Sequence, residues 1–364
     1  MTDKTKPREK KGRKRPGAAT IHDVARLAGV SPMTVSRVVN REGNVREATR
    51  AAVLTAVKDL QYAPNAAARS LAGAGGARVG LLYSNPSAAY LSEFLVGALD
   101  EASRSGAQVV LEKCEADDPQ AEAAAVQKLI KGGVAGVILP PPLCESIAVL
   151  SEFQLAGVPA VSVATGRFRG DASCVRIDDF RAAHEITRYL LQLGHRRIGF
   201  IAGHPNQTAS GERQSGFEAA MREAGIKADK SMIVSGFFSY RCGLDAADEL
   251  LSRKTIPTAI FASNDDMAAA VVSVAHRKAL DVPRDLSVVG FDDTPIATTI
   301  WPELTTIRQP IAAMAGIALE LVVREIRRRK EGIEIKPLDH LVVHTLIERS
   351  STAAPKTFAQ PAMP

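Results

Sequence analysis

The sequence predicts a small all-α head followed by a larger α/β core with two lobes and parallel sheets. Three observations support this fold class. Residues 19–63 hold short capped helices around a glycine turn, and residues 64–77 form a boundary with a proline and several glycines. From Arg78 onward, apolar strand-like segments alternate with amphipathic helices. The 364 residues are 46% hydrophobic, which is enough to build the cores of two or three domains.

The first helix of the head is predicted to begin near Ile21. Thr20 can accept a hydrogen bond at the helix N-terminus, and Asp23 can reach back to it. The apolar face of this helix then contains Val24, Leu27 and Ala28.

The second helix is predicted over residues 32–40, after a turn at Gly29. Ser31 is an N-cap and Pro32 occupies the first helical position, where its missing N–H costs nothing. The inward face contains Val35, Val38 and Val39. Two short helices joined by a glycine turn match the helix-turn-helix motif, whose second helix reads the major groove. A third helix over residues 46–60 is predicted to pack through Val53, Leu54 and Val57.

The hinge, residues 64–77, is predicted to separate the head from the core. Pro64 ends the third helix, residues 65–71 are too short to be a stable helix without a partner, and glycines follow.

Formal charge is +6 (8 − 2) over residues 1–17, +3 (7 − 4) over residues 18–73 and −3 (31 − 34) over the rest. Positive charge therefore gathers at the end expected to bind DNA phosphates. The tail, residues 1–18, is predicted to be disordered, either touching phosphates or only aiding solubility.

The core, residues 78–351, is predicted to alternate strands with helices. Expected strands are residues 79–83, 107–113, 136–140, 159–163, 197–203, 259–263 and 286–292, and expected helices are residues 91–105, 120–131, 180–193, 211–223, 243–251 and 266–277. This alternation indicates parallel sheets covered on both faces. The first crossover between lobes is expected near residue 177. A small ligand is expected between the lobes, beyond the carboxyl ends of the strands.

The chain resembles the lactose, purine and galactose repressor family of bacterial transcription regulators. The resemblance rests on TIHDVARLAGVSPMTVSRVVN in the head and on LGHRRIGFIAG, RQSGF, PTAIFASND, DLSVVGFDD and LTTIRQP in the core, and it covers residues 19–351. It implies two lobes like those of periplasmic sugar-binding proteins, a homodimer and a palindromic operator in double-stranded DNA.

The resemblance also implies which head residues touch DNA. The base-reading positions of the family fall on Pro32, Met33 and Arg37, of which only arginine can address guanine with two hydrogen bonds. The positions that hold phosphates fall on Thr34, Ser36, Asn40 and Asn44. Leu71 matches a hinge leucine that enters the minor groove, and Ala68 matches a residue beside it. One departure is Arg46, where the family usually has a Ser or Thr cap.

The effector residues implied by the resemblance are Tyr90, Arg213, Phe238, Asn264 and Asp292. Polar groups around an aromatic platform suit a sugar, whose hydroxyls donate and accept while its C–H face stacks on the ring. Arg167 stands where sugar-binding members often have an acid, which leaves room for a sugar acid or phosphate. Each residue also has a structural alternative: a loop cap for Asp292, an ion pair for Arg213, and core packing for the two aromatics.

Two other functions would each fit part of the sequence. An enzyme would need a catalytic group, but adjacent acids such as Asp292 and Asp293 point to opposite faces of an extended segment, and no nucleophile elbow, phosphate loop or zinc motif occurs. A transport-type sugar-binding protein would fit the lobes, but it would lack the head and would carry a signal peptide.

The remaining expectations concern cofactors, partners and location. The four cysteines lack CxxC spacing, so no metal or cofactor is expected. No apolar run is long enough to cross a membrane, and a cytoplasmic, nucleoid-associated protein is expected. Residues 352–364, with three prolines, are expected to be a disordered tail without a tetramer-forming bundle. Induction by the effector is favoured over corepression.

Overall fold

The computed structural model describes residues 19–39, 45–60, 62, 76–115 and 117–356. The chain forms two compact units, residues 1–75 and residues 76–364, which are described separately.

The head contains α1 (Ile21–Ala28), α2 (Pro32–Val39) and α3 (Glu47–Asp59). The Thr20 hydroxyl accepts from the Asp23 N–H, and the Asp23 carboxylate accepts from the Thr20 N–H at 3.0 Å, which closes the predicted capping box. Gly29, with φ +66°, ends α1 in the left-handed conformation. The Ser31 hydroxyl then accepts from the Thr34 N–H at 3.2 Å at the start of α2. The predicted order of helix, glycine turn and helix is confirmed.

The core of the head differs from prediction at two leucines. Val24, Val35 and Val53 are fully buried, but Leu27 is 55% exposed and Leu54 is 52% exposed. The inward positions beside the valines are held instead by the small residues Ala25 and Ala56. Alanines allow these short helices to approach closely. A prediction from side-chain hydrophobicity alone favours leucine over alanine at inward positions, which is why it was wrong here.

The first lobe (lobe 1) carries a six-stranded sheet in the order β11-β5-β4-β3-β1-β2, with every pairing parallel. Its elements up to the first crossover are β1 (Arg78–Tyr83), α5 (Ala88–Ser105), β2 (Gln108–Lys113), α6 (Pro119–Lys131), β3 (Gly136–Leu139), η2 (Leu143–Glu145), α7 (Ile147–Leu155), β4 (Ala160–Val163) and β5 (Ser173–Arg176).

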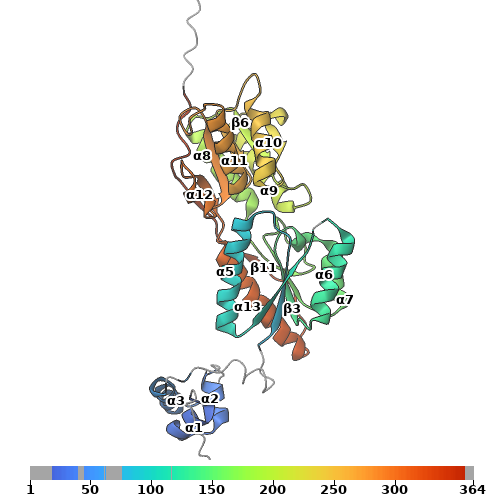
Figure 1. Ribbon diagram of the computed structural model, residues 1–364, viewed down its shortest axis with the longest axis vertical. Coiled ribbons are helices and arrows are strands. Elements are labelled where there is room, and N and C mark those ends of the chain that lie inside the picture. Colours follow the sequence, from blue (N-terminus) through green and yellow to red (C-terminus); the bar gives the residue numbers. More distant parts are fainter. Residues whose placement is uncertain (1–18, 40–44, 61, 63–75, 116, 357–364) are drawn as a thin grey trace, which may run out of the picture. The chain divides into compact units, whose positions relative to one another are not determined.

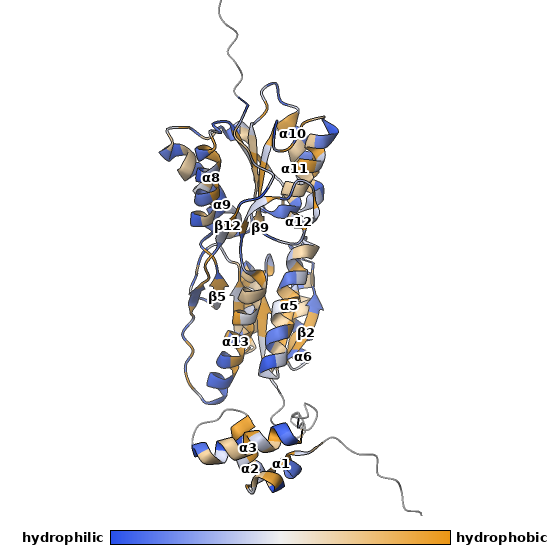
Figure 2. Cartoon of the chain, turned by 90° about the vertical axis from the view of Figure 1, so that its left-hand side faces the viewer, coloured by the Kyte–Doolittle hydropathy of each residue, from blue (hydrophilic) through white to orange (hydrophobic). Residues whose placement is uncertain are grey.

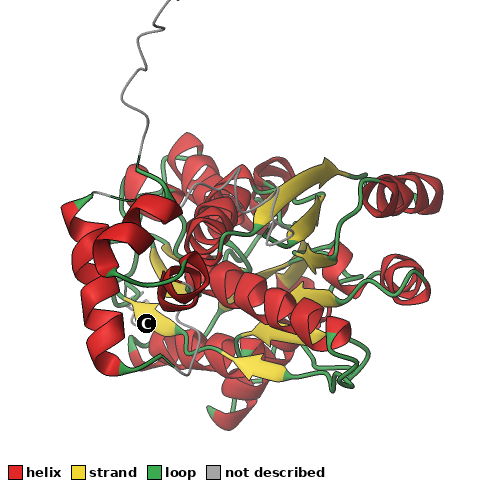
Figure 3. Ribbon diagram, turned by 90° about the horizontal axis from the view of Figure 1, so that it is seen from below, coloured by secondary structure: helices red, strands yellow, loops and turns green. Residues whose placement is uncertain are grey.

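The second lobe (lobe 2) carries a similar sheet in the order β12-β10-β9-β8-β6-β7, in which only β12 is antiparallel to its neighbour. Its elements are α8 (Asp179–Gln192), β6 (Ile198–Ala202), α9 (Thr208–Glu223), η3 (Lys230–Met232), β7 (Ile233–Ser235), α10 (Tyr240–Leu251), β8 (Ala259–Ala262), α11 (Asp265–Arg277), β9 (Ser287–Asp292), α12 (Ile296–Thr299), β10 (Thr305–Arg308) and β12 (Thr345–Ile347). Figure 3 shows the strands of the core lying among helices.

The chain crosses between the lobes more than once. The first crossover lies between β5 and α8, where the sequence places it. Lobe 1 does not end there, however. After β10 the chain returns as α13 (Ile311–Lys330) and β11 (Asp339–Leu341), which pack on lobe 1, before β12 rejoins lobe 2. The strand-like segment around His340 and His344 is therefore shared between two sheets.

Helix α13 is held tightly against lobe 1, beside α5 (Figure 1). A Cβ at Gly97 of α5 would lie 2.6 Å from the Ala312 Cα, and a Cβ at Gly136 of β3 would lie 2.6 Å from the Val322 Cγ2. Both glycines therefore let α13 approach the neighbouring backbone. The apolar residues of the core pack between sheets and helices. In Figure 2 hydrophobic colours predominate in the central strands, and hydrophilic colours are found on the surrounding helices and loops.

The expected C-terminal tail begins later than residue 352. The Thr352 and Tyr189 hydroxyls lie 2.8 Å apart, and the Ala353 N–H donates to the Ser287 hydroxyl at 3.0 Å. Residues 352–356 are therefore part of lobe 2, and residues 357–364 lie outside the described chain. No helix in the described ranges is long and apolar enough to cross a membrane.

Candidate functional site

The outward face of α2 carries the head residues predicted to meet DNA. Val35 and Val38 point into the core of the head, while Met33 is 66% exposed and Arg37 is exposed. Met33 and Arg37 are four residues apart and share one helical face. Pro32, Thr34 and Ser36 are half-buried, and Thr34 also closes the hydrogen bond with Ser31.

Four predicted DNA contacts, Asn40, Asn44, Ala68 and Leu71, lie outside the described residues. Arg46 occupies the N-cap of α3 and makes no side-chain capping hydrogen bond. The described part of the head therefore presents a protruding apolar side chain and a fork of N–H donors on one helix face.

The second candidate site is a cavity between the two lobes. All five predicted effector residues line it, together with Asn85, Pro86, Ser87, Pro141, Ala164, Gln207, Ala209 and Gln309. Nearly every lining residue stands at or just after the carboxyl end of a strand, for example Asn85 after β1 and Asn264 after β8. The volume open to the centre of a water-sized sphere is about 40 Å³, so the cavity is small with the lobes as they stand.

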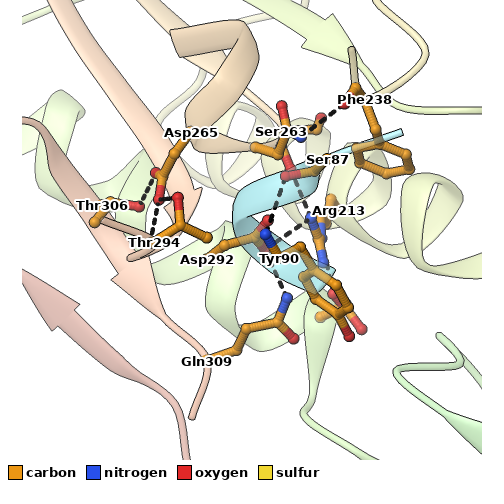
Figure 4. A network of polar contacts seen from close by, with 12 residues as sticks. Ser87, Tyr90, Arg213, Phe238, Ser263, Asp265, Asp292, Thr294, Thr306 and Gln309 are labelled. Atoms are coloured by element: carbon orange, nitrogen blue, oxygen red, sulfur yellow. Dashed lines mark hydrogen bonds and ion pairs between the residues drawn. The ribbon is translucent and has the colours of Figure 1, made fainter. Parts of the chain in front are cut away.

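Arg213, on α9, is the central charged group of the cavity and is only 4% exposed. Its Nε donates to the Asp179 carboxylate at 2.8 Å, and its Nη1 donates to the Ser263 carbonyl. The guanidinium lies 3.6 Å from the centroid of the Phe291 ring. These contacts fix the side chain in the wall of the cavity (Figure 4).

Asp292 stands opposite Arg213 at the end of β9. Its Oδ1 accepts from the Gln309 Nε2 at 2.6 Å and lies 3.9 Å from the Arg213 Nη1. Burial raises the pKa of Asp292 to about 7, although the Arg213 charge opposes this. The backbone of Asp292 has φ +110°, an unusual conformation for a non-glycine residue.

Asp265, the first residue of α11 and the neighbour of Asn264, fixes the loops around Asp292. It accepts hydrogen bonds from the Thr294 N–H at 2.7 Å and from the Thr306 hydroxyl at 2.7 Å (Figure 4). Burial raises its pKa well above the usual range, and the nearby Asp292 adds to the effect.

Two buried polar atoms in the cavity wall lack a partner in the described chain. They are the Tyr90 hydroxyl, contributed by lobe 1, and the Gln309 Oε1, contributed by a crossover. A buried polar group without a hydrogen bond costs about 1–3 kcal/mol. A ligand with hydroxyls that donate and accept would satisfy both atoms at once.

Phe238 and Asn264 form one wall of the cavity. The Asn264 side chain accepts from the Met267 N–H at 3.0 Å as the N-cap of α11, and it donates to the Phe238 carbonyl at 2.9 Å. Phe238 has φ +56°. A Cβ at Gly203 would collide with the Phe238 ring, so this glycine makes room for the aromatic platform.

Polar contacts join the lobes beside the cavity. The Glu145 carboxylate of lobe 1 accepts from the Thr208 N–H at 2.8 Å and from its hydroxyl, and the Gly166 N–H donates to that hydroxyl at 2.9 Å. Because Gln207 provides no side-chain cap for α9, Glu145 caps this helix from the other lobe. The Ser87 hydroxyl likewise bonds to Asp266 across the cleft.

Arg167 does not line the cavity. Its side chain is 71% exposed and forms an ion pair with Glu212 across the lobes. Its position therefore gives no support to an anionic ligand.

Gly166 makes a testable contact between the lobes. A Cβ there would lie 2.5 Å from the Thr208 carbonyl carbon and 2.7 Å from the Ala209 Cα, so Gly166→Ala is expected to push the start of α9 away. We expect a larger radius of gyration in small-angle X-ray scattering and faster amide exchange in the first turn of α9. Gly211→Ala, on the same helix with nothing within 4 Å of its Cβ, is the control. Equal behaviour of the two variants would contradict the expectation.

Asp292 predicts a pH dependence of stability. The folded carboxyl titrates near pH 7 and the unfolded one near 3.8, so the folded chain binds more protons between these values. The contribution of Asp292 to the free energy of unfolding therefore falls as the pH rises from about 3.8 to about 7. Relative to Asp292→Asn, the wild type is expected to lose on the order of 2–3 kcal/mol of unfolding free energy between about pH 5 and pH 8. Denaturant titrations measure this, and a constant difference would refute it.

The other titratable motifs do not form a second centre in the described chain. Asp293 pairs with Arg349 at 2.6 Å and with Arg308 at 2.6 Å and does not line the cavity. Asp292 and Asp293 both have positive φ, so the expectation of an extended segment is wrong at this pair. His344 lies 3.0 Å from Glu185. Cys114, Cys144 and Cys174 are buried free thiols, Cys242 is half-buried, and the described residues hold no group of metal-ligating side chains.

Several cavity residues were missed from the sequence. Asp179 was not predicted as a site residue, although its carboxylate holds the Arg213 guanidinium. Ser87, Gln207 and Gln309 were not predicted either. Each follows a strand closely, so a search of every strand's carboxyl end for polar side chains could have found them.

The comparisons with known proteins agree with this architecture. Residues 20–65 match the model of bacterial regulatory proteins of the lacI family, and residues 187–352 match a periplasmic binding protein-like domain. The chain is 33% identical over 323 residues to the HTH-type transcriptional repressor PurR of Haemophilus influenzae (strain PittEE), covering 87% of this chain and 94% of the relative.

Two solved structures are also similar. A complex of the transcriptional regulator CelR with cellobiose has a TM-score of 0.70 and 31% identity, covering 92% of this chain and 99% of that one. The lac repressor dimer bound to operator and the anti-inducer ONPF has a TM-score of 0.68 and 28% identity, covering 93% and 100%. This chain therefore belongs to the lacI family of bacterial regulatory proteins and is an effector-controlled, DNA-binding transcriptional repressor, not an enzyme.

Proposed function

We propose that the repressor is controlled by a neutral polyhydroxylated ligand, a sugar or close derivative, held by Tyr90, Arg213, Phe238, Asn264 and Asp292. The unpartnered Tyr90 hydroxyl and Gln309 Oε1 carry this proposal, because both residues line the same cavity and come from different segments. Sugar hydroxyls satisfy donors and acceptors together, and the Phe238 ring offers a face for C–H stacking.

The charges of the cavity favour a neutral ligand over a sugar acid or phosphate. Arg213 is already paired with Asp179 and faces Asp292, so the site has no excess positive charge. Binding would move an anionic ligand out of water and place it beside two carboxyl groups, which is unfavourable without another cation. Arg167, the cation that suggested an acid, is paired with Glu212.

We place the DNA contact on the outward face of α2. Arg37 provides the hydrogen-bonded reading of guanine, while Pro32 and Met33 offer apolar contact to thymine methyl groups. Thr34, Ser36, Asn40 and Asn44 are assigned to phosphates, and Leu71, with Ala68 beside it, to the minor groove.

Control of DNA binding follows from the way the chain crosses the cleft. Three segments join the lobes, so a ligand between them changes the relative angle of the lobes at all three. Such coupling is typically about 1–3 kcal/mol. We favour induction, in which ligand weakens operator binding, over corepression, and we place the protein on the nucleoid in the cytoplasm.

The dimer contact of lobe 1 is assigned to an exposed apolar patch. Val96 and Leu99 on α5 are each 52% exposed, and Leu111 on the edge strand β2 is 48% exposed. Clustered exposed apolar side chains usually mark an interface. Sedimentation velocity tests this: a stable dimer that Leu99→Glu converts to monomer supports the assignment, and an unaffected dimer refutes it.

The experiment that tests the proposed effector is operator binding titrated with ligands. Fragments from the gene's own neighbourhood are bound by the purified protein, and neutral sugars, sugar acids and sugar phosphates are added in turn. Release of DNA by a neutral sugar, abolished in Tyr90→Phe combined with Gln309→Leu, is the expected result. A response only to sugar phosphates would overturn the neutral ligand, and a strengthened complex would indicate corepression.

A further inference from the structure

Several helices of lobe 1 end at the same end of the lobe. The strands of the sheet are parallel, and α5, α6 and α13 run back against them, so their last turns reach the edge where β1 begins. The described core starts at Gly76, two residues before β1, and therefore enters lobe 1 at this same edge (Figure 1).

Basic side chains are concentrated at this edge. The last turns of α13 carry Arg324, Arg327, Arg328, Arg329 and Lys330, all exposed. Lys131 ends α6 and Arg78 begins β1 at the same edge. We call this set, with Lys336, the basic end face. Over residues 324–336 the formal charge is 6 − 3 = +3, whereas residues 74–364 sum to −3.

These cations lack acidic partners within the described chain. No ion pair joins Arg324, Arg327, Arg328 or Lys330 to a described carboxylate, and Arg329 donates only to the Gly157 carbonyl. Of the three acids in residues 324–336, Glu325 is buried and accepts from the Ser173 hydroxyl, and nearby arginine charges oppose the rise in its pKa that burial causes. Glu331 and Glu334 are exposed and form no ion pair with the described residues. The positive charge of the end face is therefore directed at solvent.

The stability of α13 does not require so many cations. A basic residue in the last turn of a helix contributes typically about 0.3–1 kcal/mol, and the effect fades beyond that turn. Four consecutive basic residues point in all directions around a helix, so only some can serve the helix terminus. Charges contributed by α6 and β1 gain nothing from the dipole of α13.

The partner must be strongly anionic. The head and the N-terminal tail are themselves positive, +3 and +6, so neither complements this face. DNA carries one negative charge per roughly 1.7 Å of helix axis. Only the 13 residues 63–75 separate the last described residue of the head from Gly76, a reach of at most about 45 Å. DNA bound by the head is therefore within range of the core.

We propose that the basic end face of lobe 1 contacts the phosphate backbone of the DNA that the head binds. The contact is independent of base sequence and adds to affinity through release of counterions. It makes the core a direct participant in DNA binding, in addition to its role in ligand response.

The test compares two triple variants of the full-length protein with equal charge change. One replaces Arg327, Arg328 and Lys330 by Gln. The control replaces Arg188, Arg222 and Arg277, exposed cations of lobe 2 without described ion pairs, by Gln. Binding to a 40-base-pair duplex of arbitrary sequence, and to an operator selected with the wild type, is measured at several salt concentrations.

The end-face variant is expected to lose about 0.9 in the slope of log K against log salt for each phosphate contact removed, and at least tenfold in affinity at low salt. The loss should be similar on both duplexes, because phosphates carry no sequence information. Unchanged melting temperatures show that both variants remain folded. Equal slopes for the end-face variant and the control would overturn the proposal, and loss confined to the operator would assign the face to base reading instead.

Discussion

Arg213→Met is expected to destabilise the core by about 3–5 kcal/mol, the usual cost of removing one partner from a buried ion pair. The guanidinium is 4% exposed and bonds to Asp179, which is 2% exposed. Burial raises the pKa of Asp179, and the Arg213 charge opposes that rise. Without Arg213, two carboxyl groups would face each other in a buried cavity, and methionine cannot donate to the Ser263 carbonyl.

Denaturant unfolding of the wild type and the variant measures this loss. Arg284→Met is the matched control, because Arg284 is exposed and pairs with Asp281 and Asp285 at the surface. Surface pairs contribute about 0–1 kcal/mol. Adding Asp179→Asn to Arg213→Met should restore part of the stability, since it removes an uncompensated charge. A loss below 1 kcal/mol for Arg213→Met, or no recovery in the double variant, would contradict the role assigned to the pair.

The alternation of strands and helices could be predicted because each element leaves a local pattern. The predicted helix over residues 120–131 corresponds to α6, whose N-cap Asp118 and N1 residue Pro119 are visible in the sequence. The predicted start of α9 was three residues late. Its cap is Glu145, which is distant in sequence and belongs to the other lobe. A helix end fixed by a tertiary contact leaves no local signal.

The destination of an element in the fold was harder to predict than its type. Residues 311–330 were not predicted as a helix, and nothing local in them says that they return to lobe 1. That return depends on Gly97 and Gly136, more than 170 residues earlier, which admit α13. In the head, the choice of Ala25 and Ala56 over Leu27 and Leu54 as inward residues likewise depends on how closely three helices pack.

The candidate ligand site was predicted in part by resemblance and in part by the rule for parallel sheets. The five residues implied by the family do lie around one cavity. The residues that were not predicted are those that act by holding another residue of the site. Asp179 matters because it holds Arg213, and Gln309 matters because it bonds to Asp292 and leaves its own Oε1 without a partner. Such contacts between residues distant in sequence can be seen only in the folded structure.

Arg37→Ala is expected to weaken operator binding by roughly 5- to 150-fold per half-site, which corresponds to about 1–3 kcal/mol for a bidentate contact to guanine. The reason is positional as well as chemical. Arg37 is exposed on α2 and shares a face with Met33, while Val35 and Val38 anchor the opposite face in the core of the head. The side chain is therefore held outward by the same valines that fold the helix, and removing it should leave the head intact.

Two further variants separate base reading from charge. Arg37→Lys keeps the charge but loses the planar fork of donors, so it should retain binding to arbitrary duplex DNA and still lose operator preference. Arg26→Ala removes an equal charge from α1, where Arg26 is 78% exposed and pairs with Asp23. This variant should weaken binding to both duplexes by the same factor. Fluorescence anisotropy on an operator and on a scrambled duplex gives the ratio that decides the matter. If Arg37→Ala lowers both affinities equally, Arg37 holds a phosphate, and the reading of bases passes to the apolar contacts of Pro32 and Met33.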